Sequence, residues 1–177
     1  TSRDYLLNKE VLDYDFATDA TPDEMRLIIP DAEFQFSKYG SVRTKINGVH
    51  VDITTLREEG EYKDSRHPLF IKYIKDIEKD YVRRDFTINA IYIDENFKII
   101  DFCGGLKDLE NRIIRFIGDP EKRIIEDPLR IARANRFKDT LGFTIEEKSL
   151  KAMQKYAYLL EKINPEKIKE EQRKAKK

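Results

Sequence analysis

The sequence predicts an α+β fold in which a small β-sheet is flanked by helices and followed by a helical region. Three observations support this prediction. Short segments with apolar residues at every second position occupy the earlier part of the chain, and an Asn47-Gly48 pair joins two of them. From Asp119 onward, the apolar residues repeat at helical spacing. We therefore expect one domain over residues 1–118 and a helical region over residues 119–177.

The composition excludes several classes of protein. Of the 177 residues, 40% are hydrophobic and 38% are charged, which predicts a globular core under a heavily charged surface. The 34 basic and 34 acidic side chains cancel, so nucleic-acid binding must depend on a local patch. Cys103 is the single cysteine, which excludes an internal disulfide and fits a reducing, cytoplasmic setting. No apolar stretch approaches the ~20 residues that span a bilayer, so we expect no membrane contact.

Local patterns in the first third of the chain predict mainly short strands. Apolar and acidic residues alternate around Asp13 and Asp15, which is the period of a strand and places both carboxylates on one face. A threonine before Pro22 is typical of a helix start. Asn47 and Gly48 are typical of a two-residue turn between antiparallel strands. The expected elements are a helix over residues 3–9, a strand over 11–17, a helix over 21–29 and strands over 34–36, 41–46 and 49–55.

The middle of the chain predicts a loop, a helix and a second hairpin. Residues 57–68 are charged, lack periodicity and include Gly60, so we expect an exposed loop. Gly104 and Gly105 interrupt the pattern that follows. The expected elements are a helix over residues 69–79, paired strands over 90–93 and 97–101, a short helix after Gly105 and a strand over 113–117.

The C-terminal part predicts a run of helices. Pro128 stands at a helix start, and the apolar stripe that follows it ends near Gly142. Asn164 before Pro165 opens another helix. The expected helices begin at residues 119 and 128, cover residues 145–162 and run from residue 164 to the end of the sequence.

Asp13 and Asp15 are candidate metal ligands. Their Cα atoms would lie roughly 6.5 Å apart on one strand face, a spacing that suits two Mg²⁺ ions about 4 Å apart. In the strand over residues 49–55, Val51 and Ile53 point one way and Asp52 the other, so a third carboxylate is available. Solvated aspartates on an edge strand are the alternative, although aspartate is depleted from strands.

Two later segments are candidates for nucleotide contacts. Residues 81–91 hold adjacent arginines, which suit phosphate oxygens, and short polar side chains, which suit ribose hydroxyls. Helix capping with solvated arginines is the alternative there. The residues concerned are Arg83, Arg84, Asp85, Thr87 and Asn89.

Asp127 and Arg130 would present an acceptor and a donor on one helix face. Cytosine and adenine offer an amino donor beside a ring-nitrogen acceptor, whereas uracil and guanine offer the reverse, so this pair matches C and A without a template. The alternative is that Asp127 caps the helix and Arg130 pairs with Glu126. Arg133 and Arg136 lie further along the helix, where they can reach phosphates, acidic neighbours or solvent.

Six motifs, given below in chain order, resemble those of the class II tRNA nucleotidyltransferases. This family comprises the bacterial and eukaryotic CCA-adding enzymes and is closely similar to bacterial poly(A) polymerases. The resemblance covers nearly the whole chain. It implies a nucleotidyltransferase head over residues 1–118 and a helical neck over residues 119–177. The motifs are residues 13–18 (DYDFAT), 51–57 (VDITTLR), 83–90 (RRDFTINA), 104–109 (GGLKDL), 126–130 (EDPLR) and 141–143 (LGF).

The resemblance also implies a reaction, in which the 3′ hydroxyl of tRNA attacks the α-phosphate of CTP or ATP. It places Mg²⁺ on Asp13 and Asp15, with Asp52 as a third catalytic carboxylate. Residues 57–68 resemble the family's flexible loop, which favours an enzyme able to add A. The residues expected to bind the nucleotide are Arg3, Arg84, Asp85, Asn89, Glu126, Asp127, Arg130, Arg133 and Arg136.

Two alternatives remain open. One is a poly(A) polymerase or A-adding enzyme of the same family, and the other is a non-catalytic module that binds nucleotide or RNA. The family places two glycines and a strand before the position of Thr1, and a body and tail after the neck. The resemblance therefore implies that this chain is a fragment, and it leaves the oligomeric state open.

Overall fold

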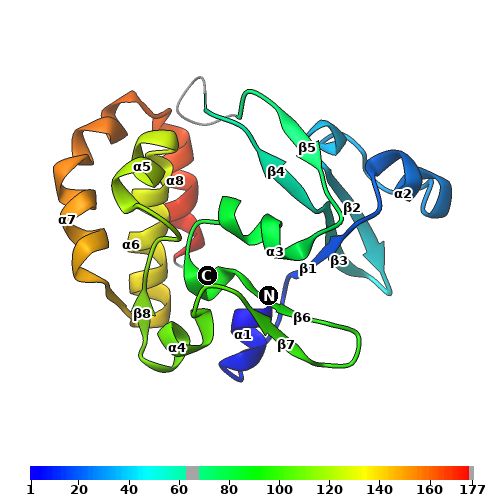
Figure 1. The fold of residues 1–177 in the computed structure, drawn as a ribbon, viewed down its shortest axis with the longest axis horizontal. Coiled ribbons are helices and arrows are strands. Elements are labelled where there is room, and N and C mark those ends of the chain that lie inside the picture. The colour runs from blue at the N-terminus through cyan, green and yellow to red at the C-terminus, as the bar shows by residue number, and fades with distance from the viewer. Residues whose placement is uncertain (63–67, 176–177) are drawn as a thin grey trace. The chain divides into compact units, whose positions relative to one another are not determined.

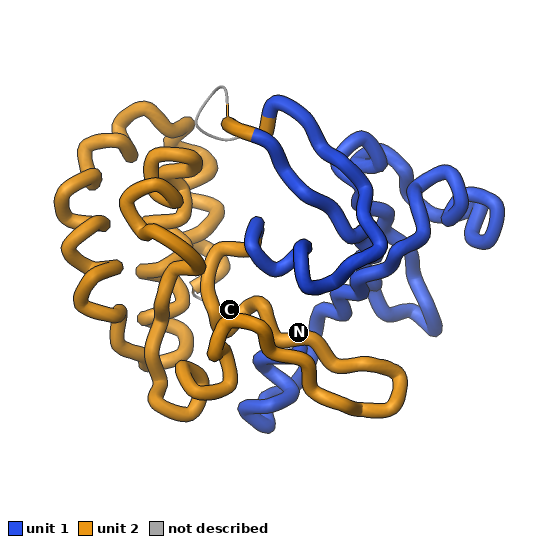
Figure 2. The backbone as a smooth tube through the Cα atoms, viewed as in Figure 1, with its two compact units in different colours: residues 1–60, 69–83 blue, residues 61–68, 84–177 orange. Residues whose placement is uncertain are grey.

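The structure is a computed structural model that describes residues 1–62 and 68–175 (Figure 1). It has the α+β character that the sequence predicts, with short strands in small sheets beside helices. The chain forms two compact units (Figure 2). The first comprises Thr1–Gly60 and Leu69–Arg83, and the second comprises Glu61–Pro68 and Arg84–Lys177. None of the described helices has the length and apolar character needed to span a bilayer.

The first unit is built on a three-stranded sheet. Its central strand, β3, runs parallel to β1 and antiparallel to β2. Asp52 of β3 lies opposite Asp15 of β1 on one side and opposite Arg43 of β2 on the other. The elements of this unit are α1 (Ser2–Leu6), β1 (Tyr14–Thr18), α2 (Pro22–Ile28), a 3-10 helix (Ser37–Tyr39), β2 (Ser41–Ile46), β3 (Val49–Thr55), β4 (Arg57–Glu59), β5 (Ile71–Tyr73), α3 (Ile77–Asp80) and a 3-10 helix (Tyr81–Arg83).

A helix cap and a tight turn, both predicted from the sequence of the first unit, are present in the structure. The Thr21 hydroxyl accepts a hydrogen bond from the Glu24 amide, and the Glu24 carboxylate accepts one from the Thr21 amide at 2.7 Å. This reciprocal cap starts α2. Asn47 and Gly48 both have positive φ angles, 51° and 81°, as a type I′ turn requires. The predicted hairpin of β2 and β3 is therefore confirmed.

Two strand predictions in the first unit need correction. β1 begins at Tyr14, so Asp13 precedes the strand. Residues 34–36 form a turn that leads into the 3-10 helix Ser37–Tyr39, and no strand. Directly before them, Glu33 forms an isolated antiparallel bridge with Arg43.

The predicted loop from residue 57 and the predicted helix from residue 69 are also wrong in part. Both segments begin as strands, β4 and β5, which pair antiparallel with Arg57 opposite Tyr73. The charged side chains of β4 favoured a loop in the sequence pattern. In the folded chain, Arg57 and Glu59 form an ion pair at 2.7 Å, which offsets two of these charges. Helical structure begins only at α3. Residues 63–67 of the predicted loop lie outside the described residues.

The second unit is mostly helical, and α6 packs against α5 and α8 (Figure 1). Phe86 is fully buried in its core, with its ring centroid 4.9 Å from that of Phe116 and 5.7 Å from that of Phe137. Its elements are a 3-10 helix (Thr87–Asn89), β6 (Ile91–Ile93), β7 (Ile99–Asp101), α4 (Gly105–Glu110), β8 (Ile113–Ile114), α5 (Pro120–Glu126), α6 (Leu129–Leu141), β9 (Thr144–Ile145), α7 (Glu147–Lys155), a 3-10 helix (Ala157–Lys162) and α8 (Pro165–Lys174).

The predicted hairpin of β6 and β7 is confirmed, as are the helix starts at residues 120 and 165. Of the strand expected over residues 113–117, only β8 (Ile113–Ile114) forms a strand, and it pairs in parallel with β9. The helix expected over residues 145–162 is interrupted at Tyr156, beyond which the chain continues as a 3-10 helix.

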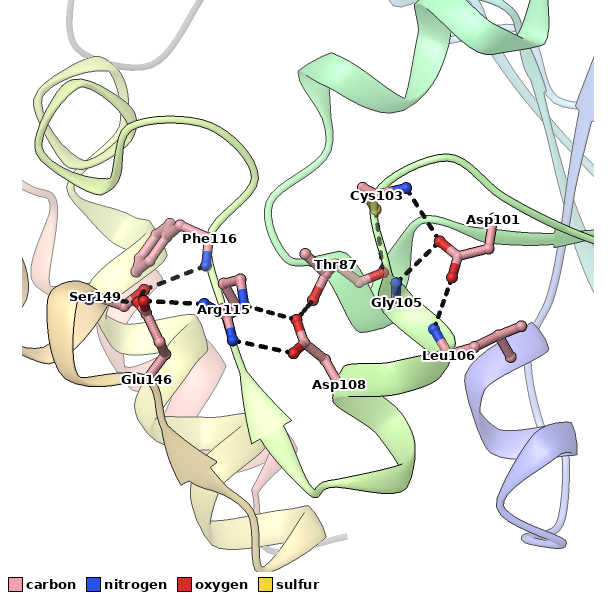
Figure 3. Close-up of polar contacts among 10 residues, drawn as sticks. All are labelled: Thr87, Asp101, Cys103, Gly105, Leu106, Asp108, Arg115, Phe116, Glu146 and Ser149. Carbon is pink, nitrogen blue, oxygen red and sulfur yellow. Dashed lines mark hydrogen bonds and ion pairs between the residues drawn. The ribbon is translucent and has the colours of Figure 1, made fainter.

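A polar network fixes the 3-10 helix Thr87–Asn89 within the second unit (Figure 3). The Thr87 hydroxyl donates to the buried Asp108 carboxylate at 2.7 Å. Arg115 donates to Asp108 at 2.9 Å and to Glu146 at 3.0 Å, and Glu146 caps α7 by accepting from Ser149. Because Asp108 lies in α4, Arg115 directly after β8 and Glu146 at the N-cap of α7, the position of Thr87 depends on segments remote from it in the sequence.

Candidate functional site

In the first unit, the sheet brings together two of the predicted catalytic carboxylates, Asp15 and Asp52. Asp15 and Asp52 are paired across β1 and β3, and paired residues of neighbouring strands share a face. Asp13 and Asp15 are exposed, and Asp52 is partly exposed. The carboxylates are therefore open to solvent and to a ligand. A hollow of about 240 Å³ is lined by Asp13, Tyr14, Arg43, His50 and Asp52.

Asp52 is held by an arginine that we did not predict. Arg43 donates from Nε to Oδ1 at 2.7 Å and from Nη2 to Oδ2 at 3.0 Å, a two-pronged ion pair across β2 and β3. The hydrogen bond and charge of Asp52, together with the charge of Asp13, raise the pKa of Arg43. A signal for this pair was present in the sequence, because a two-residue turn at Asn47 and Gly48 places residue 43 opposite residue 52.

Asp13 and Asp15 fit a magnesium ion better than they fit a closed metal cage. Among the described residues, no three or more His, Cys, Asp and Glu side chains form a group that could hold a metal ion by themselves. Mg²⁺ is usually held by one or two carboxylates together with substrate phosphates, which two exposed aspartates on an open surface allow. Asp52 fits this role less well, because both of its oxygens already accept hydrogen bonds from Arg43.

In the second unit, Asp85 lies at the centre of a cluster of predicted nucleotide-binding residues. Its Oδ1 accepts from the Phe86 amide at 2.8 Å and from Asn89 Nδ2 at 3.0 Å. Its Oδ2 accepts from Arg133 Nε at 2.8 Å and Nη2 at 2.5 Å. Burial acts to raise the pKa of Asp85, but the charge of Arg133 and these hydrogen bonds outweigh it and hold the pKa at about 2. Asp85 is therefore a fixed anion.

Arg84 is held by an aromatic side chain. Its Nε donates to the Tyr92 hydroxyl at 2.9 Å, and its guanidinium lies 4.8 Å from the centroid of the Tyr92 ring. Its backbone carbonyl accepts from Arg123 Nη2 at 2.8 Å. Tyr92 was not among the predicted site residues, because its position in β6 gave no sign that it would meet Arg84. Arg3, in the first unit, pairs with the adjacent Asp4 at 2.7 Å.

Asp127 and Arg130 were predicted to select the base, and the alternative was a role in stabilising the helix. Arg130 is only 6% exposed, and its Nη1 donates to the Arg123 carbonyl at 2.6 Å and to Glu126 at 3.0 Å. Asp127, between α5 and α6, accepts a hydrogen bond from the amide of Leu129, the first residue of α6, at 3.1 Å. Arg123 also donates to Glu126, at 2.7 Å. The role of Asp127 and Arg130 in base choice stays a prediction.

Arg133 and Arg136 both face Glu171 of α8. Arg136 Nε donates to Glu171 Oε2 at 2.7 Å, and Arg133 Nη1 lies 3.9 Å from Glu171 Oε1. Glu171 is buried, with 4% of its surface exposed. No local spacing rule connects Glu171 with Arg136, because 35 positions of sequence separate them.

Comparisons with known proteins agree with these motifs. Residues 1–115 match the family described as poly A polymerase head domain, and residues 142–175 match the family described as probable RNA and SrmB-binding site of polymerase A. The chain is 41% identical over 169 residues to the CCA-adding enzyme of Lactobacillus helveticus (strain DPC 4571), covering 96% of this chain and 42% of that protein. It is 42% identical over 164 residues to the CCA-adding enzyme of Streptococcus thermophilus (strain CNRZ 1066), covering 93% and 41%.

Solved structures show the same likeness. The crystal structure of Bacillus stearothermophilus CCA-adding enzyme in complex with CTP has a TM-score of 0.89 and 37% identity, covering 98% of this chain and 42% of that one. A tRNA nucleotidyltransferase complexed with a primer tRNA and an incoming ATP analog has a TM-score of 0.76 and 28% identity, covering 97% and 49%. The chain thus spans less than half the length of these relatives.

Proposed function

The chain belongs to the family of the poly A polymerase head domain, and on that premise we propose that it carries the nucleotidyl-transfer centre of an enzyme that adds C and A to the 3′ end of tRNA. One observation carries the proposal. Asp15 is an exposed carboxylate opposite Asp52 on a small sheet, and the exposed Asp13 directly precedes that strand, in a chain 41% identical to a CCA-adding enzyme. We further propose that residues 1–118 form the head and residues 119–177 the neck, and that the enzyme works in the cytoplasm.

Asp13 and Asp15 would hold Mg²⁺, which when bound neutralises the triphosphate and makes the attacking 3′ hydroxyl more acidic. Asp52 adds a third carboxylate whose orientation Arg43 fixes. The 3′ hydroxyl of tRNA attacks the α-phosphate of CTP or ATP, and pyrophosphate leaves. Arg84, Asp85 and Asn89 would bind the incoming nucleotide, and Arg3 would reach its phosphates.

Asp127 and Arg130 would choose the base, next to Glu126. Both hydrogen bonds described for Arg130 leave from Nη1, so Nε and Nη2 can donate to the ring nitrogen of C or A. The Asp127 carboxylate would accept from the exocyclic amino group. Uracil and guanine would place a donor against Arg130 and an acceptor against Asp127, and both contacts would be unfavourable.

A second candidate is a poly(A) polymerase, which the family description of residues 1–115 favours. The two activities differ in the nucleotide added to each tRNA end. Incubating the chain with tRNAs that lack CCA, end in C or end in CC, each with one labelled nucleoside triphosphate, separates them. We expect CMP on the first two tRNAs and AMP on the third, with no UMP or GMP.

A poly(A) polymerase would instead add AMP to all three tRNAs. Binding of CTP and ATP without any incorporation would identify a non-catalytic module. A variant with Asp13→Asn and Asp15→Asn is the matched control, because it keeps the shape of both side chains and removes their charges. Incorporation by this variant at the normal rate would contradict the proposed metal ligands.

A further inference from the structure

A chain of charged contacts in the second unit leads from α8 to the residues expected to bind the nucleotide. Glu171, in the last turn of α8, is 4% exposed and lies among three cations. Arg136 Nε donates to its Oε2 at 2.7 Å, and Lys174 Nζ donates to its Oε1 at 3.2 Å. Arg133 Nη1 lies 3.9 Å from the same Oε1. Burying a carboxylate this deeply costs free energy unless cations pair with it. The ion pairs of Glu171 therefore hold α8 against α6.

Arg133 connects Glu171 to Asp85. One edge of its guanidinium, Nε and Nη2, donates to Asp85 at 2.8 and 2.5 Å, while the opposite corner, Nη1, faces Glu171. A planar guanidinium held on two sides cannot rotate freely, so the direction of its fork toward Asp85 is set. Asp85 in turn holds the Asn89 amide at 3.0 Å.

From this geometry we propose that Glu171 is a positioning residue for the Asp85–Asn89 pair and acts through Arg133. The proposal rests on the proposed function, in which Asp85 and Asn89 bind the incoming nucleotide, and we assign the ribose hydroxyls to them because short polar side chains suit hydroxyl groups. In this proposal, the packing of α8 on α6 changes the affinity for nucleotide through Glu171, which does not contact the nucleotide itself. Arg136 then serves to hold Glu171 in place.

The test compares Glu171→Gln with Glu170→Gln. The two positions are adjacent on α8, but Glu170 is exposed and pairs only with lysines of its own helix in the described structure. Two readouts are needed for each variant. The first is the exchange rate of the Arg133 Nε proton with water, measured by NMR and identified by its loss in Arg133→Lys. The second is the ratio of the affinities for ATP and 2′-deoxy-ATP.

We expect Glu171→Gln to speed exchange of the Arg133 Nε proton and to weaken ATP binding roughly three- to tenfold, with less effect on 2′-deoxy-ATP. Glu170→Gln should change neither value. If Glu171→Gln lowers the melting temperature but leaves both readouts as in the unmodified chain, Glu171 only anchors α8 and the proposal is overturned.

The exchange measurement does not depend on nucleotide. If the unmodified chain binds no ATP, the proposed function fails, and the Arg133 Nε proton alone decides whether Glu171 positions Arg133. If Glu171→Gln does not fold, Glu171→Asp replaces it, because it keeps the charge and withdraws the carboxylate by one methylene. An unchanged Arg133 Nε proton in Glu171→Asp would then reject the proposal, and faster exchange would support it.

Discussion

At the scale of single residues, the aspartates of this chain differ in how far they are exposed. Asp13 and Asp15 are exposed, whereas the side chain of Asp85 is 11% exposed and shares a salt bridge with Arg133. An exposed carboxylate can exchange water for a metal ion at small cost. A buried carboxylate that is already paired holds its neighbours in place through hydrogen bonds.

Replacing both Asp13 and Asp15 with alanine should abolish Mg²⁺-dependent nucleotide transfer. Thermal stability should stay equal or rise, because two like charges two positions apart in the sequence no longer repel each other. Transfer assays over a range of Mg²⁺ concentrations and a melting curve check both parts. An unchanged dependence on Mg²⁺ in the double variant would rule out these metal ligands.

Asp85 should make the protein less stable in acid. Its pKa is lowered to about 2 in the folded chain, so the stability it contributes is complete above its ordinary pKa and is lost as the pH falls through about 2. The expected loss between about pH 5 and pH 2 is about 2 kcal/mol of unfolding free energy. Denaturant unfolding across this range, compared with Asp85→Asn, measures it. Parallel curves for the two proteins would contradict the prediction.

Arg130→Ala should remove selectivity against UTP and GTP. The variant leaves the ring nitrogen of C and A without a donor, which costs roughly 1–3 kcal/mol of discrimination for each base. It should also lower stability, because the buried Arg123 carbonyl and Glu126 lose a partner. Binding of all four nucleoside triphosphates, measured alongside a melting curve, distinguishes the two effects.

Asn135→Ala is the control for Arg130→Ala, since Asn135 is exposed on the same helix. It should change neither selectivity nor, by more than a few tenths of a kcal/mol, stability. An Arg130→Ala variant that is less stable but keeps its preference for C and A would show that Arg130 has a purely structural role.

At the scale of elements, α4 packs closely against the 3-10 helix Thr87–Asn89. A Cβ atom on Gly105 would lie 2.3 Å from the Thr87 carbonyl oxygen and 2.9 Å from Ile91 Cγ1. Only glycine permits this approach, because the atom it would displace belongs to the backbone. The segment that carries Asp85 and Asn89 therefore depends on Gly105 for its position.

Gly105→Ala should lower the unfolding free energy by about 1–3 kcal/mol despite the higher helix propensity of alanine. For a chain of this size the melting temperature should fall by roughly 2–12 °C. Lys107→Ala, an exposed change in the same helix, should have little effect. Equal melting temperatures for the two variants would show that α4 can move away from Thr87 at no cost.

At the scale of the whole molecule, charge limits what the chain can bind. The 34 basic and 34 acidic side chains cancel, and residues 161–177 hold seven basic and four acidic ones. Such a small local excess supports few contacts with RNA phosphates. Nucleotide binding, by contrast, depends on individual side chains and is independent of net charge.

We expect this chain to bind CTP or ATP more tightly than tRNA. Its affinity for tRNA should be weak and should fall steeply between about 50 and 200 mM salt, because each phosphate contact releases counterions. Titration of labelled tRNA at several salt concentrations measures this slope. Tight tRNA binding that is insensitive to salt would contradict the prediction and point to a binding surface independent of charge.

The sequence by itself determined the features that depend on near neighbours. The reciprocal cap at Thr21 joins residues three positions apart, and the turn at Asn47 and Gly48 depends on two residues that tolerate positive φ. The α+β class and the family also followed from the sequence, because ordered motifs and hydrophobic periods are visible without coordinates. Of the candidate site, it located Asp13, Asp15 and Asp85 as residues of interest.

Only the tertiary structure decided which distant residues meet. The strands β4 and β5 form because they pair with each other, whereas β4 alone is entirely charged and three residues are too few for a period to distinguish a strand from a helix. In the same way, the pairing of β1 with β3 sets Asp15 beside Asp52, and the docking of α8 on α6 brings Glu171 to Arg133. The physical reason is the sequence separation of the residues that stabilise each feature. Caps and turns are stabilised within a few residues, whereas these contacts exist only after burial of a shared core has brought remote segments together.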